Sequence, residues 1–287
     1  MGRSDRVGDG IDLLMITHNR PEYTRLSLTR LLDSCDETMR VWLWQNGDHE
    51  ETLEIARSLS HHPRVHAFHH SPENRLLSEP TNWLWENARG DYLSKVDDDC
   101  LLPDGWGATL RACHEQIPEL GVVGCWRFQD EDFVPELAQR KLREYPGGHT
   151  LLRNFWVEGS GYLLKRACVE EAGLLKEGQS FTSYCIDLAL GGWIHGWYYP
   201  FIPQEHMDDP RAPHSGLKDD ADLIRLLPLS ARRNGVTTLA EWEAQLRRSA
   251  RLVQEASIDP RDYRGWRKTA RRMRRRIKRL VGVRQRW

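Results

Sequence analysis

Residues 79–99 read EPTNWLWENARGDYLSKVDDD: a helical stretch that closes near Gly90, a short apolar run, and then three consecutive acids. A helical pattern that ends at a glycine and is followed at once by a strand is typical of one unit of an α/β fold. The same alternation precedes it, with strands predicted at 11–19, 40–47 and 64–70 and helices at 20–35 and 50–62. The pattern predicts a mixed, mostly parallel sheet flanked by helices.

The second half of the chain is less regular. It predicts a strand at 121–128, a strand running into a helix at 155–175, a helix followed by a strand at 184–203, and peripheral helices at 216–260. We therefore expect one α/β domain over residues 1–215, with halves at about 11–106 and 107–215. The peripheral helices form a C-terminal extension, and a basic tail follows at 261–287.

The composition is that of an ordinary globular protein, with 39% hydrophobic and 29% charged residues in a chain of 287. No apolar run reaches about 18 residues, the length that a membrane-spanning helix needs. Residues 1–10 lack the apolar core of a signal peptide. Six cysteines are scattered without CxxC spacing, which argues against a disulfide framework and a structural zinc site. We expect a cytoplasmic protein.

The formal net charge of −1 conceals an asymmetry. Residues 261–287 hold 13 Lys and Arg against a single acid, so residues 1–260 carry −13. The apolar residues of the tail recur every three or four positions, which predicts a helix with a narrow apolar stripe: Trp266, Ala270, Met273, Ile277 and Leu280. Such a helix suits an anionic membrane surface, the use that we favour. A nucleic-acid backbone, a contact with the acidic body and a solvated terminus are the alternatives.

Three carboxylates, at Asp97, Asp98 and Asp99, follow the apolar run, and burying them unpaired would be costly. Parallel sheets bind ligands at the carboxyl ends of their strands, where the clusters THNR (17–20), QNGD (45–48) and DDD would meet. Because side chains alternate along a strand, Asp97 and Asp99 should share one side. They suit a hard cation, Mg²⁺ or Mn²⁺, that leaves positions open for phosphate. A helix cap or a solvated turn is the alternative use.

Three segments resemble the nucleotide-sugar-binding segments of family 2 glycosyltransferases of the GT-A fold, in the same order and spacing. They are MITHNRPEYTRLSLTRLL (15–32), WLWQNGDHEET (42–52) and ENRLLSEPTNWLWENARGDYLSKVDDDCLLPDGW (73–106). The resemblance continues more weakly through 158–175 and 186–206. It implies a GT-A type, Rossmann-like fold whose first half binds the nucleotide sugar and whose second half binds the acceptor. The implied enzyme is a metal-dependent transferase of glycan or envelope precursor synthesis.

The resemblance also implies roles for single residues. Asp97 and Asp99 match the outer acids of the DxD motif, which hold the metal that bridges the diphosphate, and Asp98 lies between them in the donor site. Other donor-binding positions of the family fall on Thr17, Asn19, Arg20, Gln45, Asn46 and Asn82. Gln45 stands where the family usually has an Asp that reads uracil, so UDP, dTDP and GDP all remain open as the donor nucleotide.

An inverting transfer needs a general base beside the acceptor hydroxyl. The family commonly uses an Asp of an ED pair before a helix in the second half, where this chain reads SYCIDLAL (183–190) with Asp187 as the only nearby acid. The helix dipole would account for that acid equally well, and Glu158 is the second candidate. His206 is expected to complete the metal site, although the EHMDDP stretch (205–210) also suits a simple turn.

Two other functions fit parts of the pattern. A nucleotidyltransferase can share the sheet and the acids, but THNRPEY (17–23) lacks the Gly-rich basic loop that follows the first strand of such enzymes. A non-catalytic nucleotide-sugar or nucleic-acid-binding protein would account for the missing ED pair and the basic tail. We favour the glycosyltransferase, for which the donor sugar, the acceptor and the oligomeric state stay open.

Overall fold

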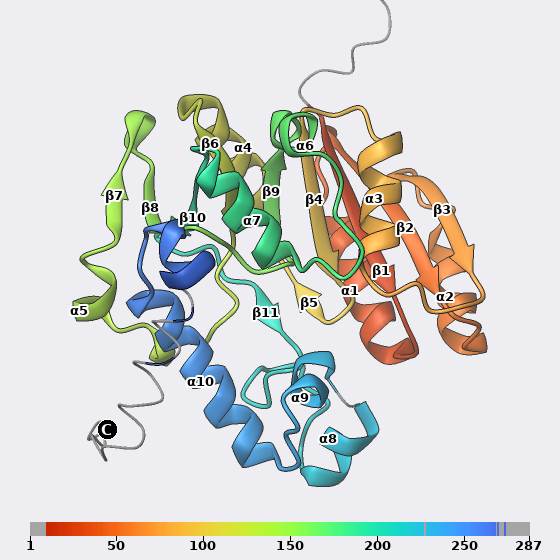
Figure 1. Ribbon diagram of the computed structural model, residues 1–287. Helices are drawn as coiled ribbons and strands as arrows, with labels where there is room; N and C mark the ends of the chain where they lie inside the picture. The colour runs from red at the N-terminus through yellow and green to blue at the C-terminus, as the bar shows by residue number, and fades with distance from the viewer. Residues whose placement is uncertain (1–9, 227, 268, 270–272, 274–287) are drawn as a thin grey trace, which may run out of the picture.

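The computed structural model describes residues 10–226, 228–267, 269 and 273. Its centre is a nine-stranded sheet in the order β3-β2-β1-β4-β9-β6-β10-β8-β7 (Figure 1). The first four strands in the chain are parallel neighbours: β1 (Ile11–Thr17), β2 (Met39–Asn46), β3 (Val65–Ser71) and β4 (Tyr92–Asp97). The helices α1 (Pro21–Ser34), α2 (Glu50–Leu59) and α3 (Ser78–Asn87) connect them. The predicted alternation of the first half is confirmed.

The second half adds antiparallel strands to this sheet. β9 (Tyr162–Lys165) lies antiparallel between β4 and β6 (Leu120–Gly124), and β10 (Ile194–Tyr199) runs parallel to β6. An edge hairpin of β7 (Leu142–Glu144) and β8 (Thr150–Asn154) follows, which the sequence did not predict. The helices of this half are α4 (Trp106–Gln116), η1 (Asp130–Asp132), α5 (Pro135–Ala138), η2 (Pro146–Gly148), α6 (Arg166–Ala172) and α7 (Phe181–Leu190). The sheet is therefore mixed and mostly parallel, as expected.

Each face of the sheet carries its own hydrophobic core. Along β1, Leu14 and Ile16 join the core under α3 and α7, whereas Leu13 and Met15 join the core under α1 and α4. All residues of β1 are buried, because a parallel strand that is covered on both faces contacts apolar side chains in both directions. Because helices cover both faces of the sheet, a ligand can reach the first strands only at their ends.

The predicted C-terminal extension consists of α8 (Asp220–Leu226), α9 (Leu229–Arg233), α10 (Leu239–Glu255) and η3 (Pro260–Tyr263). It has a small core of its own, made of Leu217, Leu223, Ala231, Trp242 and Leu246. Figure 1 shows α8 and α9 below β5 (Cys100–Leu101) and β11 (Glu205–His206), whereas α10 runs from them toward α5 and packs against α5 and η1. Most of the basic tail, and with it most of the predicted helix, lies outside the described residues.

The link between α3 and β4 differs in detail from the sequence prediction. The helix ends at Asn87 and Ala88 forms its C-terminal cap, so Gly90 is not the cap. A side chain on Gly90 would place its Cβ 2.3 Å from the carbonyl oxygen of Gly10. The Gly90 N–H instead donates to the buried Asp12 carboxylate at 2.6 Å. The glycine is required by this close approach of two backbone segments.

None of the described helices combines the length and the apolar character needed to cross a bilayer.

Candidate active site

The three consecutive acids lie where β4 ends. The strand stops at Asp97, and Asp98 and Asp99 form the turn that leads into β5. Asp97 forms an ion pair with Lys95, and its backbone N–H donates to Ser160 Oγ at 2.9 Å. Because Asp99 belongs to a turn, strand alternation does not set its direction, and its contacts differ from those of Asp97.

Asp98 points into the protein. Its carboxylate accepts hydrogen bonds from the His18 backbone N–H at 3.1 Å, from Thr24 Oγ1 at 3.3 Å and from Arg20 Nη2 at 2.8 Å. Its carbonyl oxygen accepts from Ser27 Oγ at 2.9 Å. These bonds join the turn to the loop after β1 and to the first turns of α1. Asp98 therefore fixes the position of the acidic turn.

Arg20, at the N-terminus of α1, is shared among three carboxylates. Nη2 contacts Asp98 at 2.8 Å and Asp99 at 3.2 Å, and Nη1 contacts Asp208 at 2.9 Å. Its guanidinium carbon also lies 5.2 Å from the centre of the Tyr23 ring, within the range of a cation–π contact. One guanidinium thus contacts three carboxyl groups.

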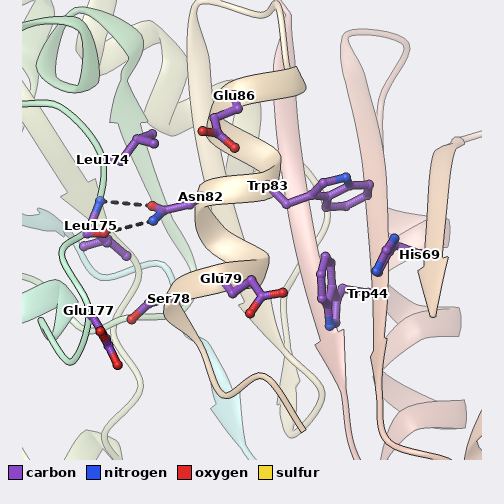
Figure 2. A pocket seen from close by; sticks show the side chains of 10 residues that line it. All are labelled: Trp44, His69, Ser78, Glu79, Asn82, Trp83, Glu86, Leu174, Leu175 and Glu177. Carbon is purple, nitrogen blue, oxygen red and sulfur yellow. Dashed lines mark hydrogen bonds between the residues drawn. The ribbon is translucent and has the colours of Figure 1, made fainter. Parts of the chain in front are cut away.

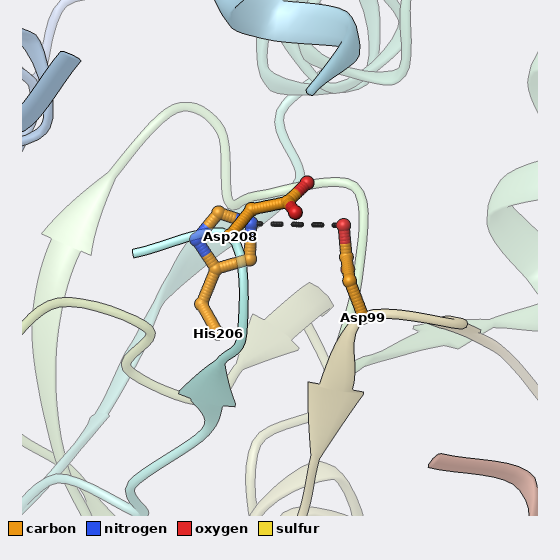
Figure 3. A group of neighbouring side chains, drawn as sticks. All are labelled: Asp99, His206 and Asp208. Atoms are coloured by element: carbon orange, nitrogen blue, oxygen red, sulfur yellow. Dashed lines mark ion pairs between the residues drawn. The ribbon is translucent and has the colours of Figure 1, made fainter. Parts of the chain in front are cut away.

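Asp99, His206 and Asp208 form a buried group (Figure 3) in which one ligand atom from each lies within 4.8 Å of the other two. β11 brings His206 there, because it pairs with β5 and places His206 opposite Cys100. Carboxylate oxygens and an imidazole nitrogen are ligands that Mn²⁺ accepts. The residues present therefore fit a divalent cation.

The electrostatics of the group favour the same fit. Burial lowers the pKa of His206 to about 4, so the imidazole is neutral near pH 7 and its 3.8 Å approach to Asp99 is no charge pair. Although burial opposes ionisation, the Arg20 guanidinium holds the pKa of Asp99 below its usual range. Burial raises the pKa of Asp208 despite Arg20. The single guanidinium of Arg20 does not stabilise the ionised forms of both Asp99 and Asp208. A divalent cation bound between the two carboxylates would stabilise both.

Several of the expected donor-binding residues are buried and bonded within the protein. Thr17 Oγ1 donates to Gln45 Oε1 at 2.5 Å, and Gln45 Nε2 donates to the carbonyl oxygens of Asn46 and Gly47. Asn46 in turn accepts from the Arg75 N–H at 3.0 Å and donates to the Leu76 carbonyl at 3.0 Å. These bonds tie the loops that follow β1, β2 and β3 to one another at the edge of the sheet.

Two further features shape that edge. Asn19 and Leu76 adopt left-handed backbone conformations, with φ of 51° and 58°, which disfavour a residue with a side chain such as Leu. Leu76 is 61% exposed. Asn46 therefore holds a strained loop whose apolar tip faces solvent.

Asn82 lies apart from the acids, in a groove of about 560 Å³ beside α3 (Figure 2). Its amide donates to the Leu175 carbonyl at 2.9 Å and accepts from the Leu175 N–H at 3.0 Å. The opposite wall of the groove is aromatic, with Trp44 stacked on His69 at 3.9 Å and Trp83 edge-on to Trp44. The contacts of Asn82 thus join α3 to the loop after α6.

The two candidate bases have different surroundings. Asp187 forms an ion pair with Arg264 and accepts from Gln179 Nε2 at 2.9 Å. Glu158 lies 3.5 Å from Arg127, and Arg127 also interacts electrostatically with Asp97 and Asp99. Of the two, Glu158 is the one that the structure connects to the acidic turn.

The model of the glycosyl transferase family 2 matches residues 12–166, more than half of the chain. The chain belongs to glycosyl transferase family 2. It is a glycosyltransferase, and its matched region covers the four parallel strands, the acidic turn and β9. No curated protein sequence matches the chain at a significant level.

Solved structures place this family 2 glycosyltransferase in the GT-A fold. It is similar to the mannosyltransferase PcManGT from Pyrobaculum calidifontis, solved with GDP-Man and Mn²⁺, with a TM-score of 0.58 and 14% identity over 93% of this chain and 80% of that one. It is also similar to GalNAc-T7, solved with UDP, GalNAc and Mn²⁺, with a TM-score of 0.55 and 12% identity over 70% of this chain. That match spans 44% of the GalNAc-T7 chain.

Sequence reasoning missed several residues around the acids of this glycosyltransferase. Asp208 belongs to the buried group, and the only signal for it was its place two residues after His206. Lys95 and Ser160 bind Asp97, although Lys95 falls within an apolar strand pattern and Ser160 lies 63 residues away along the chain. Arg127 has no local signature. Lys95 reaches Asp97 along the same strand, whereas only tertiary structure brings Asp208, Ser160 and Arg127 to the acids.

Proposed function

We propose that this glycosyltransferase moves a sugar from a nucleotide-diphosphate sugar to an acceptor hydroxyl with inversion, using Mn²⁺ or Mg²⁺, in glycan or envelope precursor synthesis. The observation that carries the proposal is the convergence of Asp99, His206 and Asp208 at the carboxyl end of β4. Ligands of parallel sheets bind at that edge. Both similar structures were solved with Mn²⁺ and a nucleotide or nucleotide sugar, which supports the metal and the donor class.

The charge of the site supports a divalent ion. Asp98, Asp99 and Asp208 share one guanidinium, that of Arg20, and His206 is neutral. When all three acids are ionised, two negative charges therefore remain uncompensated. Asp97 has a counter-ion of its own in Lys95. A bound divalent cation would balance the group and neutralise the charge that develops on the nucleoside diphosphate as it leaves.

Each protein residue has a separate part in this proposal. Asp99, His206 and Asp208 would hold the ion, while Asp98 and Arg20 fix the turn that carries Asp99. Asp97, whose side chain is 38% exposed, would face the donor. The other residues predicted to bind the donor would act chiefly by ordering the loops after β1, β2 and β3 and the contact of α3 with the loop after α6. They are Thr17, Asn19, Gln45, Asn46 and Asn82.

We place the general base at Glu158, with Asp187 as the alternative. The base would take the proton of the acceptor hydroxyl while the oxygen of that hydroxyl bonds to the anomeric carbon of the donor sugar. The bond from the anomeric carbon to the phosphate oxygen breaks at the same time, and the nucleoside diphosphate leaves. Glu158 contacts Arg127 beside the acidic turn, whereas Asp187 is engaged by Arg264 and Gln179. Two close donors thus engage Asp187, whereas the charged partner of Glu158 lies 3.5 Å away, which favours Glu158 for this step.

The experiment that tests the function is a thermal-shift screen of UDP, dTDP and GDP, each with and without Mn²⁺, followed by a hydrolysis assay with the matching nucleotide sugars. We expect one nucleotide to raise the melting temperature only with the metal, and slow hydrolysis of its sugar donor. A chain that responds to none of them with Mn²⁺ or Mg²⁺ would contradict the proposal.

We further infer that the basic tail brings the enzyme to an anionic membrane surface. The 13 Lys and Arg of residues 261–287 support this, because each basic residue near such a surface contributes about 1 kcal/mol. Flotation with vesicles of neutral or anionic lipid, using the full chain and a chain ending at residue 267, tests it. Equal partitioning of the two chains would overturn the membrane role.

A further inference from the structure

His206 and Asp208 lie on a short segment, Glu205–Asp209, that follows the region matched by the family model. The segment is anchored first to the acidic turn. β11 pairs with β5, and the Met207 N–H donates to the Asp99 carbonyl at 2.8 Å. The backbone of one ligand residue, Asp99, is thus bonded directly to the segment that carries the other two.

A second anchor comes from α1. The Tyr23 hydroxyl donates to the Met207 carbonyl at 2.9 Å and accepts from the Gly216 N–H at 2.8 Å. Tyr23 is 5% exposed. One hydroxyl group therefore joins the segment with the ligands to the start of the helical extension.

A third anchor comes from the extension itself. The indole N–H of Trp242 donates to the backbone carbonyl of Asp208 at 2.6 Å. Trp242 is 1% exposed and Asp208 3%, so the carbonyl is shielded from water and needs a protein donor. Thr238 caps α10 by accepting from the Glu241 N–H at 3.2 Å, which starts the helix one turn before Trp242 and sets the direction of the indole.

We propose that the helical extension is part of the catalytic site, and that Trp242 is the positioning residue through which it acts. By fixing the Asp208 carbonyl, Trp242 keeps the Asp208 carboxylate near Asp99 and His206. The inference rests on the proposed function, because it assumes that these three residues bind a divalent cation. Partners of ligand residues commonly change metal affinity about 10- to 100-fold when they are removed.

The test is a titration of the full chain with Mn²⁺ alone, read as the loss of the free Mn²⁺ signal in electron paramagnetic resonance. Trp242→Phe removes the N–H and retains most of the ring. Trp197→Phe is the matched control, because Trp197 is also fully buried and its indole N–H finds no acceptor in the described structure. We expect the Mn²⁺ dissociation constant to rise about tenfold or more in Trp242→Phe and to stay unchanged in Trp197→Phe.

Two further variants keep the test decisive. Trp242→His keeps a ring N–H and should recover part of the lost affinity, which a purely structural role would not produce. Tyr23→Phe removes the neighbouring anchor without touching the core of the extension, and should weaken Mn²⁺ binding even if Trp242→Phe does not fold.

The outcomes separate this inference from the proposed function. Wild-type affinity in Trp242→Phe, or equal losses in Trp242→Phe and Trp197→Phe, would overturn the positioning role while leaving the metal site in place. If Trp242→Phe does not fold, wild-type affinity in Tyr23→Phe overturns it. A wild-type chain that binds no Mn²⁺ would remove the proposed function and this inference together.

Discussion

Arg20 and Asp208, 188 residues apart in the chain, are joined by two hydrogen bonds from a single guanidinium nitrogen, at 3.0 and 2.9 Å. Through them the loop after β1 is fastened to the segment after β11. The other guanidinium nitrogen holds Asp98 and Asp99. The positions of Asp99 and Asp208, two residues of the candidate metal site, thus both depend on the Arg20 side chain.

We expect Arg20→Met to destabilise the protein by about 3 kcal/mol or more, because it leaves buried carboxylates without their counter-ion. The free energy of unfolding in urea measures this, and Mn²⁺ should restore more stability to the variant than it adds to the wild type. Arg225→Met, which breaks the exposed pair with Asp222, is the control and should change little. Similar losses in both variants would show that Arg20 is not a key counter-ion.

Asp99→Asn and Asp208→Asn should each abolish the thermal stabilisation by Mn²⁺ plus nucleotide, because each removes a charged ligand. Hydrolysis of the donor should fall about a hundredfold or more, the scale of losing one preorganised electrostatic group. Asp104→Asn changes an exposed acid of the same segment, whose side chain is 80% exposed, and should behave as the wild type. Retained Mn²⁺ binding in both site variants would exclude this group as the metal site.

Glu158→Gln should lower the transfer rate by about two orders of magnitude or more while leaving nucleotide binding intact, because it removes only the proton acceptor. Asp187→Asn should keep most of the activity and lose its charge pairing with Arg264. Steady-state rates and nucleotide affinities of the two variants distinguish these roles. The reverse pattern would assign the base to Asp187.

The free energy of unfolding should decrease as the pH is lowered below 6.5, and the buried imidazole of His195 should account for part of this decrease. His195 accepts from the Val122 N–H and donates to the Cys185 carbonyl, both at 3.1 Å. Burial lowers its pKa from 6.5 to about 3. Between these values the unfolded chain binds a proton that the folded protein does not, which costs about 1.4 kcal/mol per pH unit.

His195→Gln, which keeps a donor and an acceptor, should therefore show a shallower loss of stability between pH 6 and 4, measured by urea unfolding at several pH values. His61→Gln, at an exposed position, serves as the control. An unchanged slope in His195→Gln would mean that this imidazole binds protons equally in the folded and unfolded chains across this window, contrary to the prediction.

The first half of the fold was predictable because its signals are local. β1 to β4 are apolar runs that end in polar clusters, and helices of ordinary length separate them. The hairpin of β7 and β8 was missed because it lies at the edge of the sheet, and none of the three residues of β7 is buried. Short, half-exposed edge strands carry little of the periodicity on which such predictions rest.

The candidate site was predictable only in part, for a similar reason. The acids of residues 97–99 and His206 stand out in the sequence, but Asp208 becomes a partner of Asp99 only when β11 pairs with β5. The turn at Asp98 also ends the alternation from which a shared side for Asp97 and Asp99 was expected. The contacts of Trp242 and Arg127 with this region join distant parts of the chain, and no local pattern encodes them.

The position of β9 has a consequence for biosynthesis. β4 has β1 on one side and β9 on the other, and β9 ends only at Lys165. A nascent chain that has emerged as far as the acidic turn therefore exposes one edge of β4, which other unpaired strands can join. The first half of the sheet reaches its final arrangement only after some 60 further residues have left the ribosome, and a fragment that stops at residue 106 should aggregate.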